Sequence, residues 1–203
     1  MKIGRLAMGL AVSLALPCFG CGEATPTAAS PDSVDTKVSG AKAPDFDLKS
    51  LTGETVRLSS LRGKVVLIDF WSTICDPCLK EMPELVRLYE ERKDKGFVVL
   101  AIATDGPETV ANVSTVAKER NMVFPVLLDT ETAVLDRYNP EGRLPFTEVV
   151  DKDGVVVLKR SGYQPGDVES QKSLVAAIDR ALGSTEPTPP AASTPAPSPA
   201  SNP

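Results

Sequence analysis

The chain has 203 residues, which is enough for one folded domain with further segments at its ends. Its 18 prolines are concentrated towards the C-terminus, and the rest of the composition is ordinary for a globular protein. The formal net charge of -5 at pH 7 argues against a nucleic-acid-binding protein.

Residues 1–21 have the pattern of a secretory signal. Lys2 and Arg5 supply positive charge, and residues 6–16 form an apolar run that is too short to span a bilayer. Cys21 follows a glycine, which indicates a lipoprotein cleavage site with Cys21 as the acylated N-terminus. The alternative is ordinary signal-peptidase cleavage without acylation. In both cases the chain leaves the cytoplasm, and we expect a lipid-anchored, periplasm-facing protein of the bacterial cell envelope.

The segments on either side of the expected domain differ from it in composition. Residues 22–42 contain few large apolar groups, so we expect a flexible tether there. Residues 184–203 consist mostly of Pro, Ala, Ser and Thr without periodicity, which predicts a disordered tail with polyproline II character. One domain is therefore predicted over residues 43–183.

The hydrophobic pattern of this domain predicts strands that alternate with helices. Residues 65–71 are nearly all apolar, as expected of a central strand that is buried on both faces. Asp153-Gly154 marks the turn of a later hairpin, and Gly96 marks the end of the longest helix. The expected strands are 46–48, 56–58, 65–71, 97–103, 125–128, 146–151 and 155–160, and the expected helices are 76–95, 108–120, 131–138 and 168–182. This order predicts an α/β fold with a central mixed sheet flanked by helices.

Two cysteines three residues apart stand where the apolar strand 65–71 gives way to the helix 76–95. Backbone N–H groups and the helix dipole at such a junction favour a thiolate, so we expect Cys75 to be a nucleophile. Cys78 lies almost one turn further on the same side and can resolve a mixed disulfide. The alternatives are half of a zinc site, which needs four ligands although the chain has no histidine, and two inert core cysteines.

Asp69 lies inside the apolar strand that precedes the dithiol. Burial is costly for a carboxylate and raises its pKa towards the range in which it exchanges protons near neutrality. The alternative is an aspartate at a strand end in contact with water. Asp76, between the cysteines, is expected to oppose thiolate formation at Cys75, which makes the reduced form a better electron donor.

Several short motifs around the dithiol carry a resemblance to a known family. They are Ala43-Pro44-Asp45-Phe46-Asp47-Leu48, Leu61-Arg62-Gly63-Lys64, Phe70-Trp71, the Cys75–Cys78 dithiol and Glu81-Met82-Pro83. With them, the run 43–182 resembles thioredoxin-like redoxins of the TlpA/ResA type, which are bacterial extracytoplasmic thiol-disulfide oxidoreductases. The resemblance implies a thioredoxin-like fold with an N-terminal β-hairpin extension. It also implies that Asp69, which matches the buried acid of thioredoxins, deprotonates Cys78.

The resemblance also implies a substrate-binding surface. A cis-proline, here Pro145, would face the dithiol, and the backbone of Leu144 would pair with the bound substrate chain. Trp71 would lie beside the dithiol as a further substrate-binding residue, and the alternative is that it only fills the core. The run 142–148 is one residue longer than is usual in the family, so the groove is expected to differ in shape.

From this resemblance we expect a reductant of disulfides in target proteins, with apocytochrome c as a typical target of the family. The expected internal Cys75–Cys78 disulfide would be reduced by a membrane thiol donor of the quinol/DsbD-like type. We expect a monomer with no cofactor, no metal and no nucleic-acid partner.

Two other functions occur on neighbouring branches of the fold. A peroxiredoxin-like thiol peroxidase would use Ser72, three residues before Cys75, but Ile68 occupies the place of the proline in that motif. A copper-delivery protein would need CxxxC and a distant histidine, and the sequence offers CxxC and no histidine.

Overall fold

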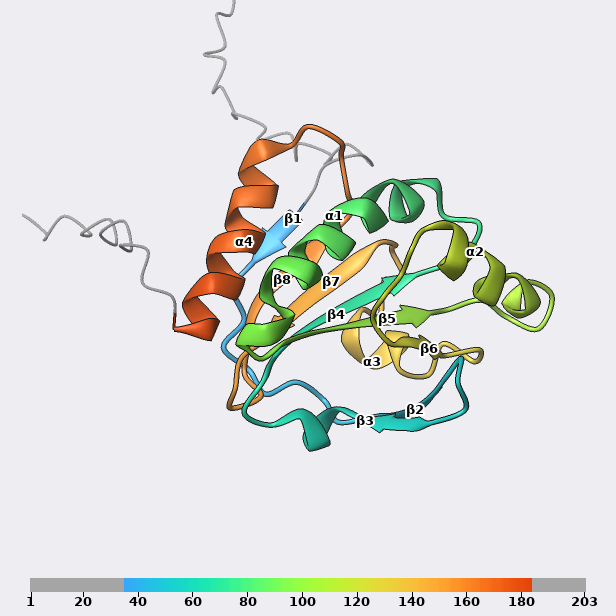
Figure 1. Ribbon diagram of the computed structural model, residues 1–203, viewed down its shortest axis with the longest axis horizontal. Helices are drawn as coiled ribbons and strands as arrows, with labels where there is room; N and C mark the ends of the chain where they lie inside the picture. The colour runs from blue at the N-terminus through green and yellow to red at the C-terminus, as the bar shows by residue number, and fades with distance from the viewer. Residues whose placement is uncertain (1–34, 184–203) are drawn as a thin grey trace, which may run out of the picture. The chain divides into compact units, whose positions relative to one another are not determined.

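The computed structural model describes residues 35–183, and these form one central sheet covered by helices on both faces (Figure 1). Within these residues the strand order is β1-β8-β7-β4-β5-β6-β2-β3. The strands are β1 (Asp35–Lys37), β2 (Asp47–Ser50), β3 (Thr55–Arg57), β4 (Val65–Trp71), β5 (Phe97–Ala103), β6 (Val126–Leu128), β7 (Phe146–Val150) and β8 (Val156–Ser161). β4, β5 and β6 are parallel, and the remaining pairs are antiparallel, so the predicted mixed sheet is confirmed.

The helices divide between two apolar clusters, one on each face of the sheet. They are α1 (Asp76–Arg92), α2 (Val113–Glu119), α3 (Leu135–Tyr138) and α4 (Val168–Leu182). Side chains of α1, α2 and α4 join the first cluster, and side chains of α3 join the second. No helix within residues 35–183 is long and apolar enough to cross a membrane.

β4 lies at the centre of the sheet and is buried along its whole length. It pairs with β5 on one side and β7 on the other, so all of its backbone groups can bond within the sheet. Side chains alternate between faces along a strand, and Leu67 and Trp71 accordingly belong to the first cluster while Ile68 and Phe70 belong to the second. Asp69 therefore points to the face covered by α1.

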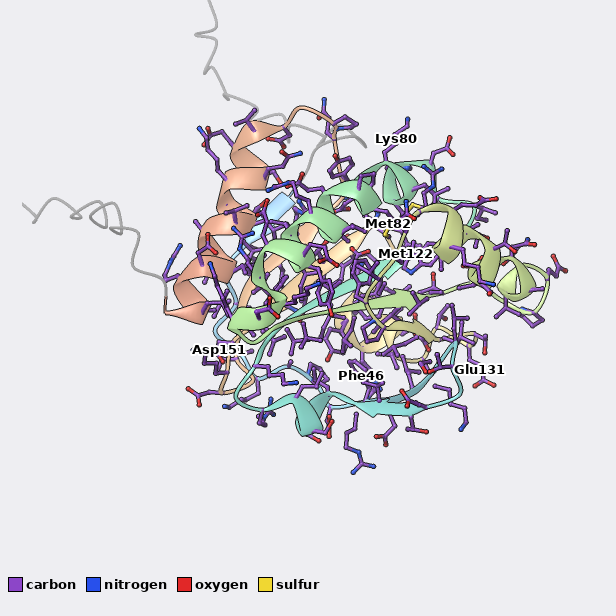
Figure 2. The ribbon with its side chains drawn as sticks, viewed as in Figure 1. Phe46, Lys80, Met82, Met122, Glu131 and Asp151 are labelled. Carbon is purple, nitrogen blue, oxygen red and sulfur yellow. A yellow bond between two sulfur atoms is a disulfide. The ribbon has the colours of Figure 1, made fainter. Side chains whose placement is uncertain are left out.

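α1 presents an apolar stripe to this face of the sheet. Its buried side chains are Cys78, Glu81, Met82, Leu85 and Leu88. Figure 2 shows Met82 on the side of α1 that faces the sheet and Lys80 on the outer side. Pro83 lies inside the helix, as predicted, and the following 3-10 turn ends at Gly96, whose φ of 84° is the left-handed conformation that glycine adopts readily.

The structure corrects the predicted flexible tether over residues 22–42. Asp35–Lys37 form β1, which pairs with β8 at the edge of the sheet. A second contact follows, because Gly40 N–H donates to the carbonyl of Val156 at 2.8 Å. These contacts are between backbone groups, so the side chains gave no apolar pattern to detect. The earlier part of the tether, the signal segment with Cys21 and the tail over 184–203 lie outside the described residues.

Two helices begin later than predicted. The first part of the predicted helix 108–120 is a 3-10 turn over Val110–Asn112, and α2 begins after it. In the predicted helix 131–138, the buried carboxylate of Asp129 accepts hydrogen bonds from the N–H groups of Val134 and Leu135. These bonds satisfy free N–H groups at the start of α3, which begins later than the sequence pattern indicated.

Candidate active site

The dithiol occupies the junction between β4 and α1. Cys75 and Cys78 form a disulfide with a Cα–Cα distance of 5.3 Å. Cys75 is the N-cap residue of α1, and the N–H of Cys78 donates to Cys75 Sγ at 3.3 Å. Cys75 is partly exposed whereas Cys78 is fully buried. The arrangement gives one sulfur that a substrate can reach and a second that is shielded from solvent behind it.

A buried carboxylate fixes the loop that leads into the dithiol. Asp105 follows β5 and accepts hydrogen bonds from both the N–H and the hydroxyl of Thr73. Sequence reasoning missed this contact, because it joins residues 32 positions apart. Ile74, between Thr73 and Cys75, is 79 % exposed, so a large apolar side chain stands in solvent next to the accessible sulfur.

Asp69 is fully buried, in agreement with the interpretation of its place in the strand. The hydroxyl of Thr147 donates to Asp69 Oδ1 at 3.1 Å, and Oδ2 has no hydrogen-bond partner among the described residues. Burial raises the pKa of Asp69 to about 7, although the nearby charge of Arg160 and the Thr147 hydrogen bond act in the opposite direction. Asp69 can therefore exchange a proton at neutral pH.

Sequence reasoning also missed a buried ion pair on this face of the sheet. Arg160 of β8 pairs with Glu81 of α1, and both side chains are about 1 % exposed. One signal was present, because Leu158 and Arg160 occupy buried positions that alternate with half-buried ones along β8. A charged residue at such a position is easily read as the point where a strand reaches solvent.

The Leu144–Pro145 peptide bond is cis, as the resemblance implied. Pro145 is buried, whereas Leu144 is partly exposed and packs against the same apolar cluster as Cys75. The side chain of Trp71 is 0 % exposed within that cluster, which agrees with the alternative that it fills the core and not with a substrate contact. β4 is covered on both faces, so its last side chain supports the dithiol from inside the core.

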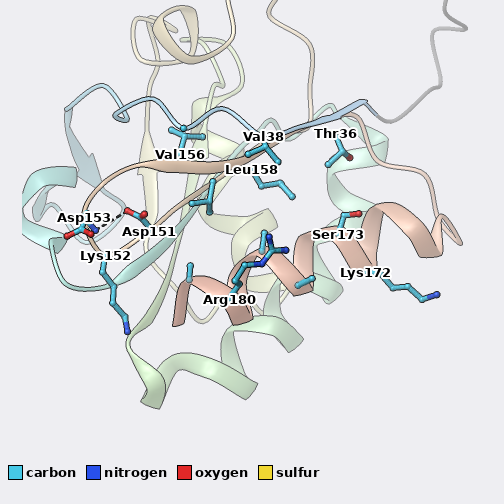
Figure 3. A pocket seen from close by; sticks show the side chains of 15 residues that line it. Thr36, Val38, Asp151, Lys152, Asp153, Val156, Leu158, Lys172, Ser173 and Arg180 are labelled. Atoms are coloured by element: carbon cyan, nitrogen blue, oxygen red, sulfur yellow. Dashed lines mark hydrogen bonds between the residues drawn. The ribbon is translucent and has the colours of Figure 1, made fainter. Parts of the chain in front are cut away.

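A cavity of about 790 Å³ lies elsewhere, between α4 and the strands β1 and β8 (Figure 3). Val38, Leu158 and Ala177 contribute to its apolar wall, and Lys172 and Arg180 stand along α4. Its lining includes neither cysteine of the dithiol nor Asp69. Within residues 35–183 there is also no cluster of three or more His, Cys, Asp or Glu side chains that could hold a metal ion.

A redox disulfide at the start of a helix, after the central strand of a mixed sheet and with a cis-proline in the domain, defines a thiol-disulfide oxidoreductase of the thioredoxin-like fold. Comparison with known proteins agrees with this class. The profile of the AhpC/TSA family matches residues 39–159, and the chain belongs to that family.

The relatives to which the chain is similar carry names of the same class. It is 40% identical over 125 residues to the thiol-disulfide oxidoreductase ResA of Bacillus cereus, a match that covers 62% of this chain and 70% of the relative. A thiol:disulfide interchange protein from Bacteroides sp. has a TM-score of 0.59 and 30% identity, covering 71% of this chain and 90% of its own. A thioredoxin family protein from Chlorobium tepidum has a TM-score of 0.60 and 26% identity, covering 72% and 99%.

Proposed function

We propose that this thiol-disulfide oxidoreductase works as a reductant of disulfides in exported proteins. The observation that carries the proposal is the Cys75–Cys78 disulfide, with one accessible sulfur at the helix start and a buried acid on the adjacent strand. The acidic Asp76 beside Cys75 supports this direction, because a less stabilised thiolate makes the dithiol a stronger electron donor.

The reaction has two thiol exchanges. The Cys75 thiolate attacks one sulfur of the target disulfide, the target S–S bond breaks, and its second sulfur leaves as a thiolate that takes a proton from water. Cys78 then loses its proton to Asp69 and attacks Cys75 Sγ. The bond between Cys75 and the target breaks, and the target sulfur that Cys75 had attacked leaves as a thiolate. The target has gained two electrons, and the chain is left with its internal disulfide.

The substrate would approach over the partly exposed side of the dithiol. Leu144 and Ile74 supply apolar surface there, and the backbone of Leu144, before the cis-Pro145, is the proposed partner of the extended target chain. An apocytochrome c fits this description as a target. A membrane thiol donor of the quinol/DsbD-like type is the proposed source of electrons that reduce the internal disulfide again.

The same proposal places the protein in the bacterial cell envelope on the periplasmic side, anchored through an acylated Cys21. The basic and apolar pattern of residues 1–21 supports export, and a redox disulfide suits an oxidising compartment. Fractionation tests the anchor, because Cys21→Ser should move the protein from the membrane to the soluble fraction. Wild-type protein found in the soluble fraction would contradict it.

Reduction of insulin disulfides tests the activity. Cys75→Ser should abolish it, because the attacking sulfur is gone, and Cys78→Ser should trap a mixed disulfide between Cys75 and the substrate. Insulin reduction that survives in Cys75→Ser would overturn the proposal.

The reduction potential of the Cys75–Cys78 couple tests the direction. We expect a value nearer to that of thioredoxin, about -270 mV, than to that of the oxidant DsbA, about -120 mV. A value close to that of DsbA would mean that the protein oxidises its targets. Rapid consumption of hydrogen peroxide with a sulfenate at Cys75 would instead favour a thiol peroxidase.

A further inference from the structure

Three neighbouring strands place Asp69, Thr147 and Arg160 in one row across the sheet. Asp69 of β4 is directly opposite Thr147 of β7, and Thr147 is directly opposite Arg160 of β8. Directly opposite residues of antiparallel strands lie on the same face with Cβ atoms about 5 Å apart. Leu67 and Leu158, two residues away on their strands, join the cluster that contains Cys78. The whole row therefore faces the side of the sheet on which α1 and Cys78 lie.

Contacts connect this row to the helix that carries the dithiol. Arg160 Nη2 donates to Thr147 Oγ1 at 3.3 Å, and that hydroxyl donates its own proton to Asp69 Oδ1 at 3.1 Å. The same Nη2 pairs with Glu81, which lies three residues after Cys78 and is buried with it on the inner side of α1. All four polar side chains are nearly inaccessible to water. One guanidinium thus connects β8, β7 and α1 beneath the dithiol.

The balance of charge in this group is uneven. Two carboxyl groups, Asp69 and Glu81, share one cation, and Tyr163 and Asp167 are the further titratable groups whose charge acts on Arg160. A second uncompensated negative charge is costly in a region without water. Glu81 is in direct contact with the cation, whereas Asp69 is connected to it only through the hydroxyl of Thr147. Asp69 is therefore the member of the group that gains and loses a proton.

We propose that Arg160 is a positioning residue of the redox site, which acts on Cys78 through Thr147 and Asp69. Its buried charge compensates Glu81 and holds the Asp69 carboxylate ready to accept the proton of Cys78. When that proton moves, the net charge of Asp69, Glu81 and Arg160 changes from -1 to zero, and the Cys78 sulfur forms its bond to Cys75 as the target sulfur leaves. The inference rests on the proposed function, in which Asp69 is the base for Cys78.

Single-turnover reduction of a disulfide substrate by the reduced full chain, followed across pH, tests this role. The central variant is the double substitution Glu81→Gln with Arg160→Met, which removes the ion pair without leaving a bare charge. The reference is Glu81→Gln alone, which keeps the cation. Relative to that single variant, removal of Arg160 should raise the pKa of Asp69, so the midpoint of the resolving step should move up by about one pH unit or more. The rate at which Cys75 is alkylated in the same protein controls for changes in the first exchange.

A smaller change tests the link itself. Thr147→Val keeps the shape of the side chain but removes the hydroxyl that joins Arg160 to Asp69, and it should move the midpoint in the same direction by a smaller amount. Thr147→Ser should restore the wild-type profile. Glu148→Gln, on the other face of the sheet, is the matched control and should leave the profile unchanged. If the double variant does not fold, the comparison of Thr147→Val with Thr147→Ser tests the role of Arg160 by itself.

Asp69→Asn separates this inference from the proposed function. If Asp69→Asn abolishes the pH-dependent limb while the folded double variant keeps the midpoint of Glu81→Gln and Thr147→Val keeps the wild-type midpoint, Arg160 has only a structural role and the inference is wrong. If Asp69→Asn itself leaves the limb in place, Asp69 is not the base and the proposed proton transfer fails. Direct titration of the Asp69 carboxyl carbon by ¹³C NMR should show the same shift of midpoint as the kinetics.

Discussion

Two buried carboxyl groups occupy adjacent rows at the centre of the sheet and point to opposite faces. Asp69 shares its row with Thr147 and Arg160, and the neighbouring row contains Glu148. Glu148 lies opposite Ile68 on β4 and Lys159 on β8. Each acid therefore has a cation in its own row, both cations belong to β8, and each acid is fully buried. The two rows are similar in that each places a buried acid and a cation on the same face of the sheet.

Burial raises the pKa of both acids, with Arg160 and Lys159 acting in the opposite direction. The cations differ, because the Lys159 side chain is 30% exposed whereas that of Arg160 is only 1% exposed. The faces differ as well, since both cysteines within residues 35–183 lie on the side of Asp69. A raised pKa thus indicates burial, and it indicates a function only where a group that can exchange the proton is next to it.

The largest expected effect separates the two acids by activity. Asp69→Asn should slow the resolving step by about 10²-fold or more, which is the usual contribution of a positioned acid or base. Glu148→Gln should leave the rate within about twofold of wild type, because neither Cys75 nor Cys78 lies on its face. Stopped-flow measurement of substrate release at pH 7 compares the two variants. Equal losses in both would mean that the comparison of the two faces has no functional meaning.

The next effect concerns the two cations and the stability of the fold. Arg160→Met leaves Glu81 buried without its partner, which should cost about 3–5 kcal/mol of unfolding free energy. Lys159→Met should cost roughly 1–3 kcal/mol, because its partly exposed ammonium contributes less and Glu148 can take up a proton instead. Urea unfolding of the two oxidised variants at pH 7 measures the difference. A Lys159→Met variant as unstable as Arg160→Met would contradict it.

The local sequence was sufficient to predict the dithiol and the strand before it. An unbroken apolar run followed by CxxC and a helical pattern defines the β4–α1 junction, and an aspartate inside such a run has few ways to reach water. The cis bond before Pro145 came from family resemblance, because the residues by themselves favour a trans bond. The long strands and helices were predicted for the same reason as β4, since each carries its own periodicity.

The row that supports Asp69 could not be predicted in this way. Its members lie on three strands, and the pairing of β7 with both β4 and β8 sets which residues are opposite one another. No local pattern records that register. Arg160 and Thr147 are also polar residues at inward positions, where a sequence pattern favours apolar ones. β1 escaped prediction for a related reason, because backbone pairing at a sheet edge requires no apolar side chains.

The smallest of the expected effects is the dependence of stability on pH, which isolates the Asp69 carboxyl in the folded protein. The pKa of an unfolded aspartate is about 4, and burial raises that of Asp69 to about 7. Between these values the native state binds a proton that the unfolded state releases, so this contribution is present at low pH and is lost as the pH rises through 7. From pH 5 to pH 8 the loss should be about 2–3 kcal/mol.

Urea unfolding of the oxidised protein, in which Cys75 and Cys78 do not titrate, measures this loss. Wild type and Glu148→Gln should each lose more stability over this pH range than Asp69→Asn does, by that amount. If Asp69→Asn loses as much stability as wild type over that range, Asp69 does not hold a proton in the folded protein. The difference between the Asp69 face and the Glu148 face of the sheet would then rest on geometry alone.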